Sequence, residues 1–168
     1  MSTFQYSIFV KATPEAIWDA LVDADQTGKY GYGGRAEYDL REGGSFKHHA
    51  TDEMKQHGMP DVVVEGDVLE VEAPRRLVQT WRANFAPDIA AEPAGRMTIA
   101  TEDAHPLMFP NGGVTKLTLT HELENAPLTA GIVSGETADA GGGWAFVLSD
   151  LKSYLETGSS LNGQAVDG

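Results

Sequence analysis

The sequence has 168 residues, no cysteine and a formal net charge of −13 at pH 7. This length fits one domain with room for a cavity in its core. The lack of cysteine excludes disulfides, thiolate nucleophiles and cysteine-based zinc or iron–sulfur sites. The acidity disfavours nucleic acid and anionic membranes as partners. No apolar run approaches the roughly 20 residues that span a bilayer, and the first residues lack the pattern of a signal peptide, so we expect a cytoplasmic protein.

Apolar residues alternate with polar or small ones over residues 4–10, which predicts a half-buried strand. A helix is expected directly afterwards. Thr13 suits the N-cap, Pro14 the first helical position, and Glu15 the positive end of the helix dipole. A second short helix is predicted over residues 23–29, followed by a glycine-rich loop.

Six further segments have the pattern of strands. They are residues 35–40, 45–50, 62–71, 76–83, 96–101 and 114–123. The first two flank Glu42-Gly43-Gly44, which predicts a hairpin turn. Gly66 indicates a bulge or a close approach of two backbones. Residues 84–95 and 102–113 are rich in Pro, Ala, Gly and acidic residues, so we expect loops there.

The last element is a long helix with one broad apolar stripe. Trp144, Leu148, Leu151 and Leu155 recur at spacings of three and four residues, and Gly158 is a fitting end. The sequence therefore predicts one domain over residues 1–158 and a flexible tail over residues 159–168. The order of elements is strand, two short helices, six strands and a long helix. It predicts an α+β helix-grip fold, in which a curved antiparallel sheet of about seven strands surrounds the C-terminal helix.

Five ordered segments carry a resemblance to a known family. They are residues 12–21 (ATPEAIWDAL), 41–46 (REGGSF), 65–71 (EGDVLEV), 74–81 (PRRLVQTW) and the pair Gly143-Trp144. Together they resemble the single-domain branch of the activator of heat-shock-protein-90 ATPase homologues (AHSA-type), within the START and birch-pollen-allergen-like (SRPBCC) superfamily. The resemblance covers about residues 4–157.

This resemblance implies the helix-grip fold and, from the wider superfamily, a cavity that holds a small apolar molecule. The family name comes from two-domain co-chaperones of the stress response, in which a separate N-terminal domain takes part in binding the chaperone. These 168 residues contain no counterpart of that domain. The aromatic residue that usually follows the second helix as Trp is here Tyr30 or Tyr32.

Strand alternation selects the residues that face the interior. His48 shares a face with Phe46, whereas His49 points to the opposite face, so the adjacent histidines cannot hold one metal ion together. His121 follows Leu119 at a spacing of two and is also expected to point inward. The complete set of predicted cavity residues is Tyr32, Phe46, His48, Val64, Trp81, Phe85, Met97, Leu119, His121, Trp144 and Leu148. Core packing is the competing interpretation for each of them.

The favoured function is binding of a small hydrophobic molecule in an internal cavity. The first alternative is an enzyme of the cyclase, hydrolase or dehydratase type that uses histidine or tyrosine as acid–base groups. The second is a co-chaperone-like interaction module, which predicts an exposed apolar patch and a filled interior. We expect no cofactor and no metal ion, and either a monomer or a homodimer.

Overall fold

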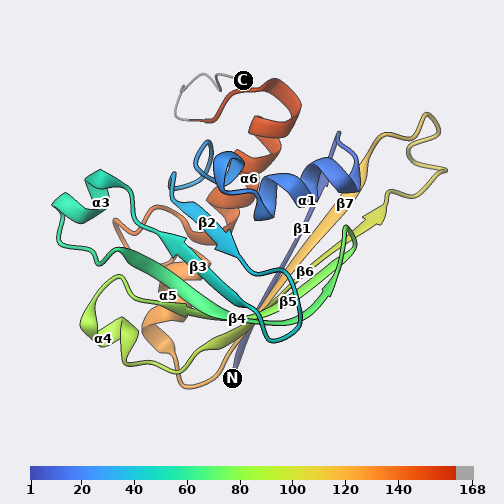
Figure 1. Cartoon of the computed structure of the whole chain (residues 1–168). Helices are drawn as coiled ribbons and strands as arrows, with labels where there is room; N and C mark the ends of the chain where they lie inside the picture. The colour runs from blue at the N-terminus through green and yellow to red at the C-terminus, as the bar shows by residue number, and fades with distance from the viewer. Residues whose placement is uncertain (162–168) are drawn as a thin grey trace.

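The computed structural model describes residues 1–161. Seven strands form one sheet in the order β1-β7-β6-β5-β4-β3-β2 (Figure 1), and all neighbours are antiparallel. The strands are β1 (Ser2–Val10), β2 (Arg35–Tyr38), β3 (Ser45–His49), β4 (Val62–Glu72), β5 (Arg76–Ala83), β6 (Gly95–Asp103) and β7 (Thr115–Leu123). This arrangement confirms the predicted α+β fold with a curved antiparallel sheet.

Two short helices follow β1, as the sequence predicts. In α1 (Pro14–Val22), the Thr13 side chain accepts a hydrogen bond from the backbone of Ala16. In α2 (Ala24–Thr27), the Asp23 side chain accepts from the first turn. These caps satisfy backbone N–H groups that would otherwise lack partners, and so they fix where each helix begins.

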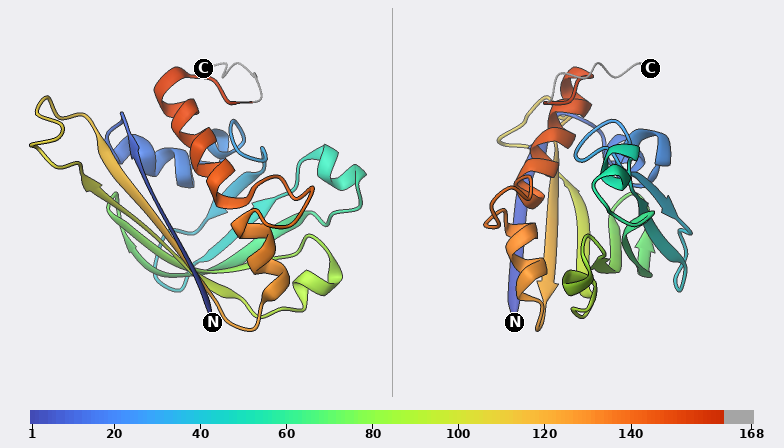
Figure 2. Two further views of the ribbon diagram at one scale, coloured as in Figure 1. Left: turned by 180° about the vertical axis from the view of Figure 1, so that it is seen from behind. Right: turned by 90° about the vertical axis from the view of Figure 1, so that its left-hand side faces the viewer.

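The long helix α6 (Gly143–Thr157) crosses the concave side of the sheet, and Gly158 ends it in the left-handed conformation with φ of 76°. In the right-hand view of Figure 2, α6 lies over β1 and β7, while β2 lies on the other side of the molecule. Contacts between α6 and β1 agree with this view. The helix therefore covers one half of the sheet more closely than the other.

Three further helices were not predicted from the sequence. A loop was expected at α4 (Pro87–Ala90), and no helix or strand was expected at α3 (Asp52–Gln56) or α5 (Pro127–Ser134). Two of them begin with proline at the first helical position, and α3 has Thr51 as its N-cap. These signals were present in the sequence, but the helices are short and lack a clear apolar stripe. The loop predicted over residues 102–113 is present from residue 104 onward, and only its first two positions belong to β6, which extends to Asp103.

A glycine on β4 allows β4 and β5 to approach each other closely. A Cβ atom at Gly66 would collide with the carbonyl oxygen of Thr80 on β5, so the predicted close approach is present there. The bulge in this pair of strands lies instead between Val68 and Glu70. Among residues 1–161, no helix combines the length and apolar character needed to cross a membrane.

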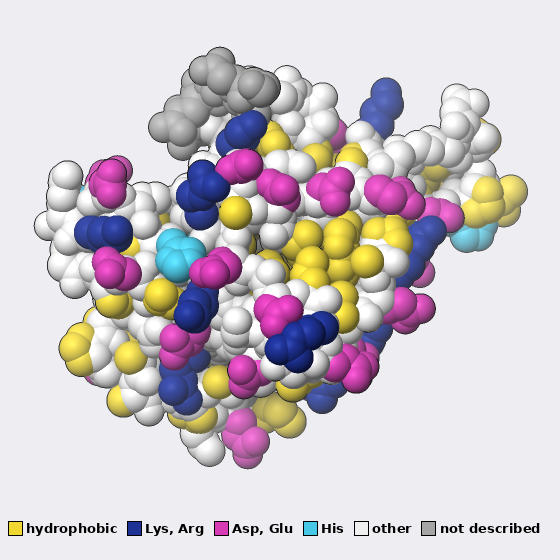
Figure 3. All heavy atoms as spheres, in the orientation of Figure 1, with side chains coloured by type: hydrophobic (Ala, Val, Ile, Leu, Met, Phe, Trp, Pro, Cys, Tyr) yellow, Lys and Arg dark blue, Asp and Glu magenta, His cyan; other side chains and the backbone are white. Residues whose placement is uncertain are grey.

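Apolar side chains form two clusters. The larger lies between α6 and the sheet, and the smaller contains Trp18, Val68 and Leu77, with Val22 and Val71 packed against it. Figure 3 shows acidic and basic side chains distributed around an apolar area on the visible face. The tail predicted over residues 159–168 lies mostly outside the described residues. Within them, Leu161 donates its backbone N–H to Asp150, so this part is held against α6.

Candidate functional site

A cavity of about 530 Å³ lies on the concave side of the sheet. Its strand residues come from β2 to β6, and none comes from β1 or β7. The remaining wall residues belong to α1, α2 and the loop after it, the region around α3, the loop after β5, α5, the loop between α5 and α6, and α6. The wall contains Leu21, Thr27, Tyr30, Gly31, Tyr32, Ala36, Tyr38, Phe46, His48, Met54, Met59, Val63, Val64, Trp81, Phe85, Met97, Ile99, Ile132, Val133, Asp139, Ala140, Gly141, Gly143, Trp144 and Val147.

The structure brings most of the predicted cavity residues together at this wall. They are Tyr32, Phe46, His48, Val64, Trp81, Phe85, Met97 and Trp144. Those on β3 to β6 lie there because period-two alternation turns their side chains to the concave side. The wall also has members that no periodic pattern of the sequence indicated, such as Met54, Met59 and Ile132.

Leu119, His121 and Leu148 do not line the cavity, and their predicted place in its wall is corrected. All three side chains are almost fully buried. Leu119 and His121 are on β7, next to edge strand β1, where α6 lies closest to the sheet. Because the gap between helix and sheet is narrow there, side chains fill it. The cavity is consequently displaced toward β2 to β6.

His121 forms a compact aromatic group with two wall residues. The Trp144 indole donates a hydrogen bond from Nε1 to Nδ1 of His121, with 3.0 Å between the two nitrogens. The Trp81 ring lies edge-on to the imidazole, with 5.0 Å between the ring centroids. Because indole nitrogen only donates, Nδ1 of His121 is unprotonated and the proton of the neutral ring lies on Nε2. Burial lowers the pKa of His121 to about 4. This histidine fixes the two indoles from behind the wall.

His48 is the imidazole that does line the cavity. Burial lowers its pKa, while a hydrogen bond to the backbone of Gly34 raises it by a smaller amount. Gly34 leaves the space for this contact, since a Cβ atom there would collide with the imidazole.

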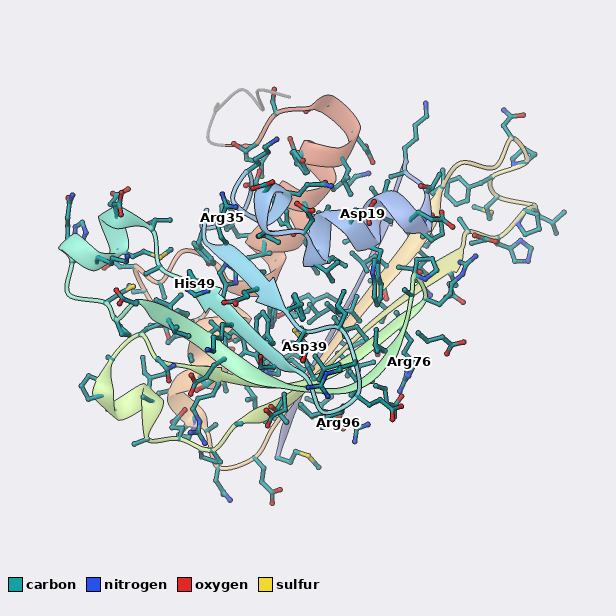
Figure 4. All side chains as sticks on the ribbon, viewed as in Figure 1. Asp19, Arg35, Asp39, His49, Arg76 and Arg96 are labelled. Atoms are coloured by element: carbon teal, nitrogen blue, oxygen red, sulfur yellow. The ribbon has the colours of Figure 1, made fainter. Side chains whose placement is uncertain are left out.

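His49 points to the opposite face, as predicted from strand alternation. Its Nε2 lies 2.8 Å from the Glu37 carboxylate. It is the register partner of Arg35, and Figure 4 shows the two on neighbouring strands β2 and β3. Within residues 1–161, no group of three or more His, Asp or Glu side chains could hold a metal ion.

A buried carboxylate positions the loop that carries Tyr30 and Tyr32, here called the tyrosine loop, at the cavity. Asp150, in the middle of α6, is inaccessible to solvent and accepts a hydrogen bond from the backbone of Gly31 at 2.8 Å. Tyr30 donates its hydroxyl proton to the carbonyl of Ala20 at 2.7 Å. Burial raises the pKa of Tyr30, so this phenol stays protonated. The sequence did not indicate the role of Asp150, because an acidic residue within an amphipathic helix usually lies on its solvent-exposed face.

Tyr32 lies at the boundary between cavity and solvent, with 43% of its surface exposed. Its hydroxyl accepts a hydrogen bond from the backbone of Gly143 at 3.2 Å and donates to Ala140 at 3.4 Å. The ring also packs on Gly141, where any Cβ atom would meet it. Tyr32 therefore joins the loop after α2 to the start of α6.

Glu92 connects two other segments that contribute to the wall. Its carboxylate accepts hydrogen bonds from the backbone of Leu128 and from both the backbone and hydroxyl of Thr129, at 2.7–2.8 Å. Burial raises the pKa of Glu92, but the three hydrogen bonds together lower it by a larger amount, so the net shift of the pKa is downward. A carboxylate at the start of α5 also interacts favourably with the helix dipole. Glu92 thus holds α5 beside the loop that carries Phe85.

An antiparallel sheet that surrounds a long helix and leaves an apolar cavity between them defines the helix-grip class. The chain belongs to the family described as activator of Hsp90 ATPase homolog 1-like protein, whose model matches residues 11–156. This match confirms the resemblance seen in the sequence. A search of curated proteins found no match.

Several solved structures share this fold. The CalU16 crystal structure from Micromonospora echinospora is 20% identical with a TM-score of 0.61, covering 92% of this chain and 76% of that one. PFC0360w, described as an HSP90 activator from Plasmodium falciparum, is 22% identical with a TM-score of 0.53, covering 96% and 92%. The Aha1 dimer from Colwellia psychrerythraea is 18% identical with a TM-score of 0.64, covering 94% and 98%. At these identities the likeness concerns the fold alone.

Proposed function

We propose that this protein binds one small apolar molecule in the cavity between α6 and strands β2 to β6. The observation that carries the proposal is a space of about 530 Å³ inside a wall made mainly of aliphatic and aromatic side chains. Protein interiors are normally packed with few voids larger than a water molecule. A space of this size is typical of pockets that take small organic ligands.

The two alternative functions have less support. An acid–base enzyme built on both imidazoles would need His48 and His121 in one cavity, but only His48 lines it. An interaction module would have a filled interior, which the cavity argues against. The likeness to an HSP90 activator supports a co-chaperone role only through the shared fold. We further propose a cytoplasmic location and a monomeric or homodimeric state; sedimentation equilibrium distinguishes the two states.

The first experiment is extraction of protein purified under native conditions, with mass spectrometry of the released small molecules.

The second experiment is titration with an apolar fluorescent probe, using two matched variants. Val64→Phe adds volume at the wall, so we expect probe affinity to fall at least about tenfold with little change in stability. Leu119→Phe adds a similar group in the packed region, where overpacking costs about 1–3 kcal/mol of stability, and we expect probe affinity to be retained.

The comparison of the two variants decides whether the cavity is the binding site. Equal probe affinity for Val64→Phe and the parent protein would place the probe elsewhere on the molecule. Absence of both a bound molecule and probe binding in the parent protein would overturn the proposed function.

A further inference from the structure

The hydroxyl groups of the cavity wall already donate their protons to the protein. Thr27 donates to the carbonyl of Ala24 at 3.1 Å. Tyr38 donates to the side-chain oxygen of Gln79 at 2.7 Å, and Tyr30 and Tyr32 donate to the backbone carbonyls named above. These oxygens keep lone pairs, so toward a ligand they act as hydrogen-bond acceptors.

The wall also lacks a side chain that could neutralise an anion. Among the described residues, no Lys or Arg lines the cavity, and the one carboxylate at its wall is that of Asp139. Transfer of an ionised carboxylate from water into such surroundings is strongly unfavourable unless a cation pairs with it. The acidic chain adds repulsion of the same sign, since its formal net charge is −13.

His48 supplies the strongest acceptor on this wall. Its ring lines the cavity and lies against Gly34. In the neutral imidazole one of the two ring nitrogens has a free lone pair. Burial, the largest influence on its pKa, favours this neutral form. His48 thus accepts a hydrogen bond and cannot serve as a cationic partner for a carboxylate.

We propose that the ligand is an uncharged apolar molecule with a hydroxyl group, an alcohol or a phenol, whose O–H donates to His48. This inference rests on the proposed binding function and adds the chemical class of the ligand. Three features of the wall lead to it. The hydroxyl groups already donate their protons within the protein, His48 offers an imidazole acceptor, and no cationic side chain is present among the described wall residues. Carboxylic acids of the same size and shape are excluded from this class.

The test uses three probes with one bicyclic core, namely naphthol, methoxynaphthalene and naphthoate, titrated by calorimetry at neutral pH. We expect naphthol to bind about tenfold more tightly than its methyl ether, because the ether cannot donate to His48. Naphthoate should bind at least about 100-fold more weakly than naphthol. His48→Leu should remove the preference for naphthol over the ether, while His49→Leu, on the outer face, should retain it.

A third variant guards against misfolding of His48→Leu. His48→Gln keeps an acceptor oxygen, so its preference for naphthol should be at least partly retained. Equal affinities for naphthol and the ether in the parent protein, or tight binding of naphthoate, would overturn the ligand class but leave the binding function standing. If none of the three probes binds and no other apolar probe does, both proposals fail together.

Discussion

The indole of Trp144 and the imidazole of His121 are joined by a hydrogen bond of 3.0 Å that connects the first turn of α6 to β7. The bond requires an unprotonated Nδ1 on His121, because indole nitrogen has no lone pair to offer. Protonation of the imidazole would break it and place a charge in a site without solvent. The position of α6 over the sheet therefore depends on a neutral histidine.

This dependence predicts a loss of stability in mild acid. The pKa of His121 is about 4 in the folded protein, against an ordinary value of 6.5. Below pH 6.5 the unfolded chain takes up a proton that the folded protein does not, so stability falls as pH falls toward 4. The contribution of this residue at pH 5 is about 2 kcal/mol lower than at pH 7.5.

His121→Gln isolates this effect. Its side-chain oxygen can accept from Trp144, but it does not titrate. We expect urea unfolding of the variant to lose about 2 kcal/mol less stability between pH 7.5 and pH 5 than the parent protein does. Parallel pH profiles for the two proteins would contradict the assignment. Because His48 is retained in both, its own titration cancels in the comparison.

A second prediction concerns the attachment of α5. Glu92→Gln keeps the size of the side chain but replaces one acceptor oxygen by a donor, which then faces backbone or hydroxyl donors. We expect a loss of about 1–2 kcal/mol in the free energy of unfolding. Glu136→Gln, an exposed acid beyond the end of α5, serves as the control and should change stability by less than about 0.5 kcal/mol.

The same pair of variants reports on the cavity, because Ile132 and Val133 of α5 belong to its wall. Glu92→Gln should increase the dissociation rate of a bound probe, measured by stopped flow, whereas Glu136→Gln should not. A probe dissociation rate that is identical in both variants would show that the attachment of α5 does not control access to the cavity.

The pKa of Glu92 is lowered in the folded protein. Its stabilising contribution is therefore present above the ordinary carboxyl pKa and is lost as the pH falls through the pKa of the folded protein.

The third prediction tests the buried acid of α6. Asp150→Asn leaves one acceptor for two backbone donors, those of Gly31 and Leu161, and directs an amide group toward one of them. We expect a loss of about 2–3 kcal/mol in stability. Ser149→Ala, the neighbouring exposed position on the same helix, should remain within about 0.5 kcal/mol of the parent protein. Similar stability of the two variants would mean that Asp150 does not fix the tyrosine loop.

The sequence was most informative where one physical rule fixes one structure. Thr13 before Pro14 predicted the start of α1, and alternation along the strands predicted which side chains turn to the concave face. Alternation also separated His48 from His49. Both rules are local, since caps and strand faces depend on residues only a few positions apart.

The limits of the cavity could not be predicted in the same way. Leu119 and Trp81 both alternate inward, but α6 lies over the first and leaves space beside the second. That difference is set by the position of the helix along the sheet, which arises from contacts between residues distant in sequence. The contribution of Ile132 was missed for a related reason. Helix α5 has Pro127 and Gly135 at its ends, but its apolar residues do not recur at a helical spacing that would have predicted the helix.

The last prediction compares two tryptophans of equal exposure. Trp81 and Trp18 are each 7% exposed, but only Trp81 lines the cavity, whereas Trp18 belongs to the smaller packed cluster. Truncation of a packed aromatic side chain to alanine costs about 3–5 kcal/mol of stability. We expect Trp18→Ala to show this full loss. Trp81→Ala should cost less, because part of its ring faces an existing space and already lacks packing partners.

Probe binding should respond in the opposite order. Trp81→Ala removes a large part of the cavity wall and the edge-on partner of His121, so probe affinity should fall at least about tenfold. Trp18→Ala should leave affinity nearly unchanged for the fraction of protein that is folded. Thermal unfolding and calorimetric titration of both variants measure the two effects separately. A stability loss in Trp81→Ala equal to that in Trp18→Ala, with probe affinity unaltered, would assign Trp81 to core packing rather than to a ligand site.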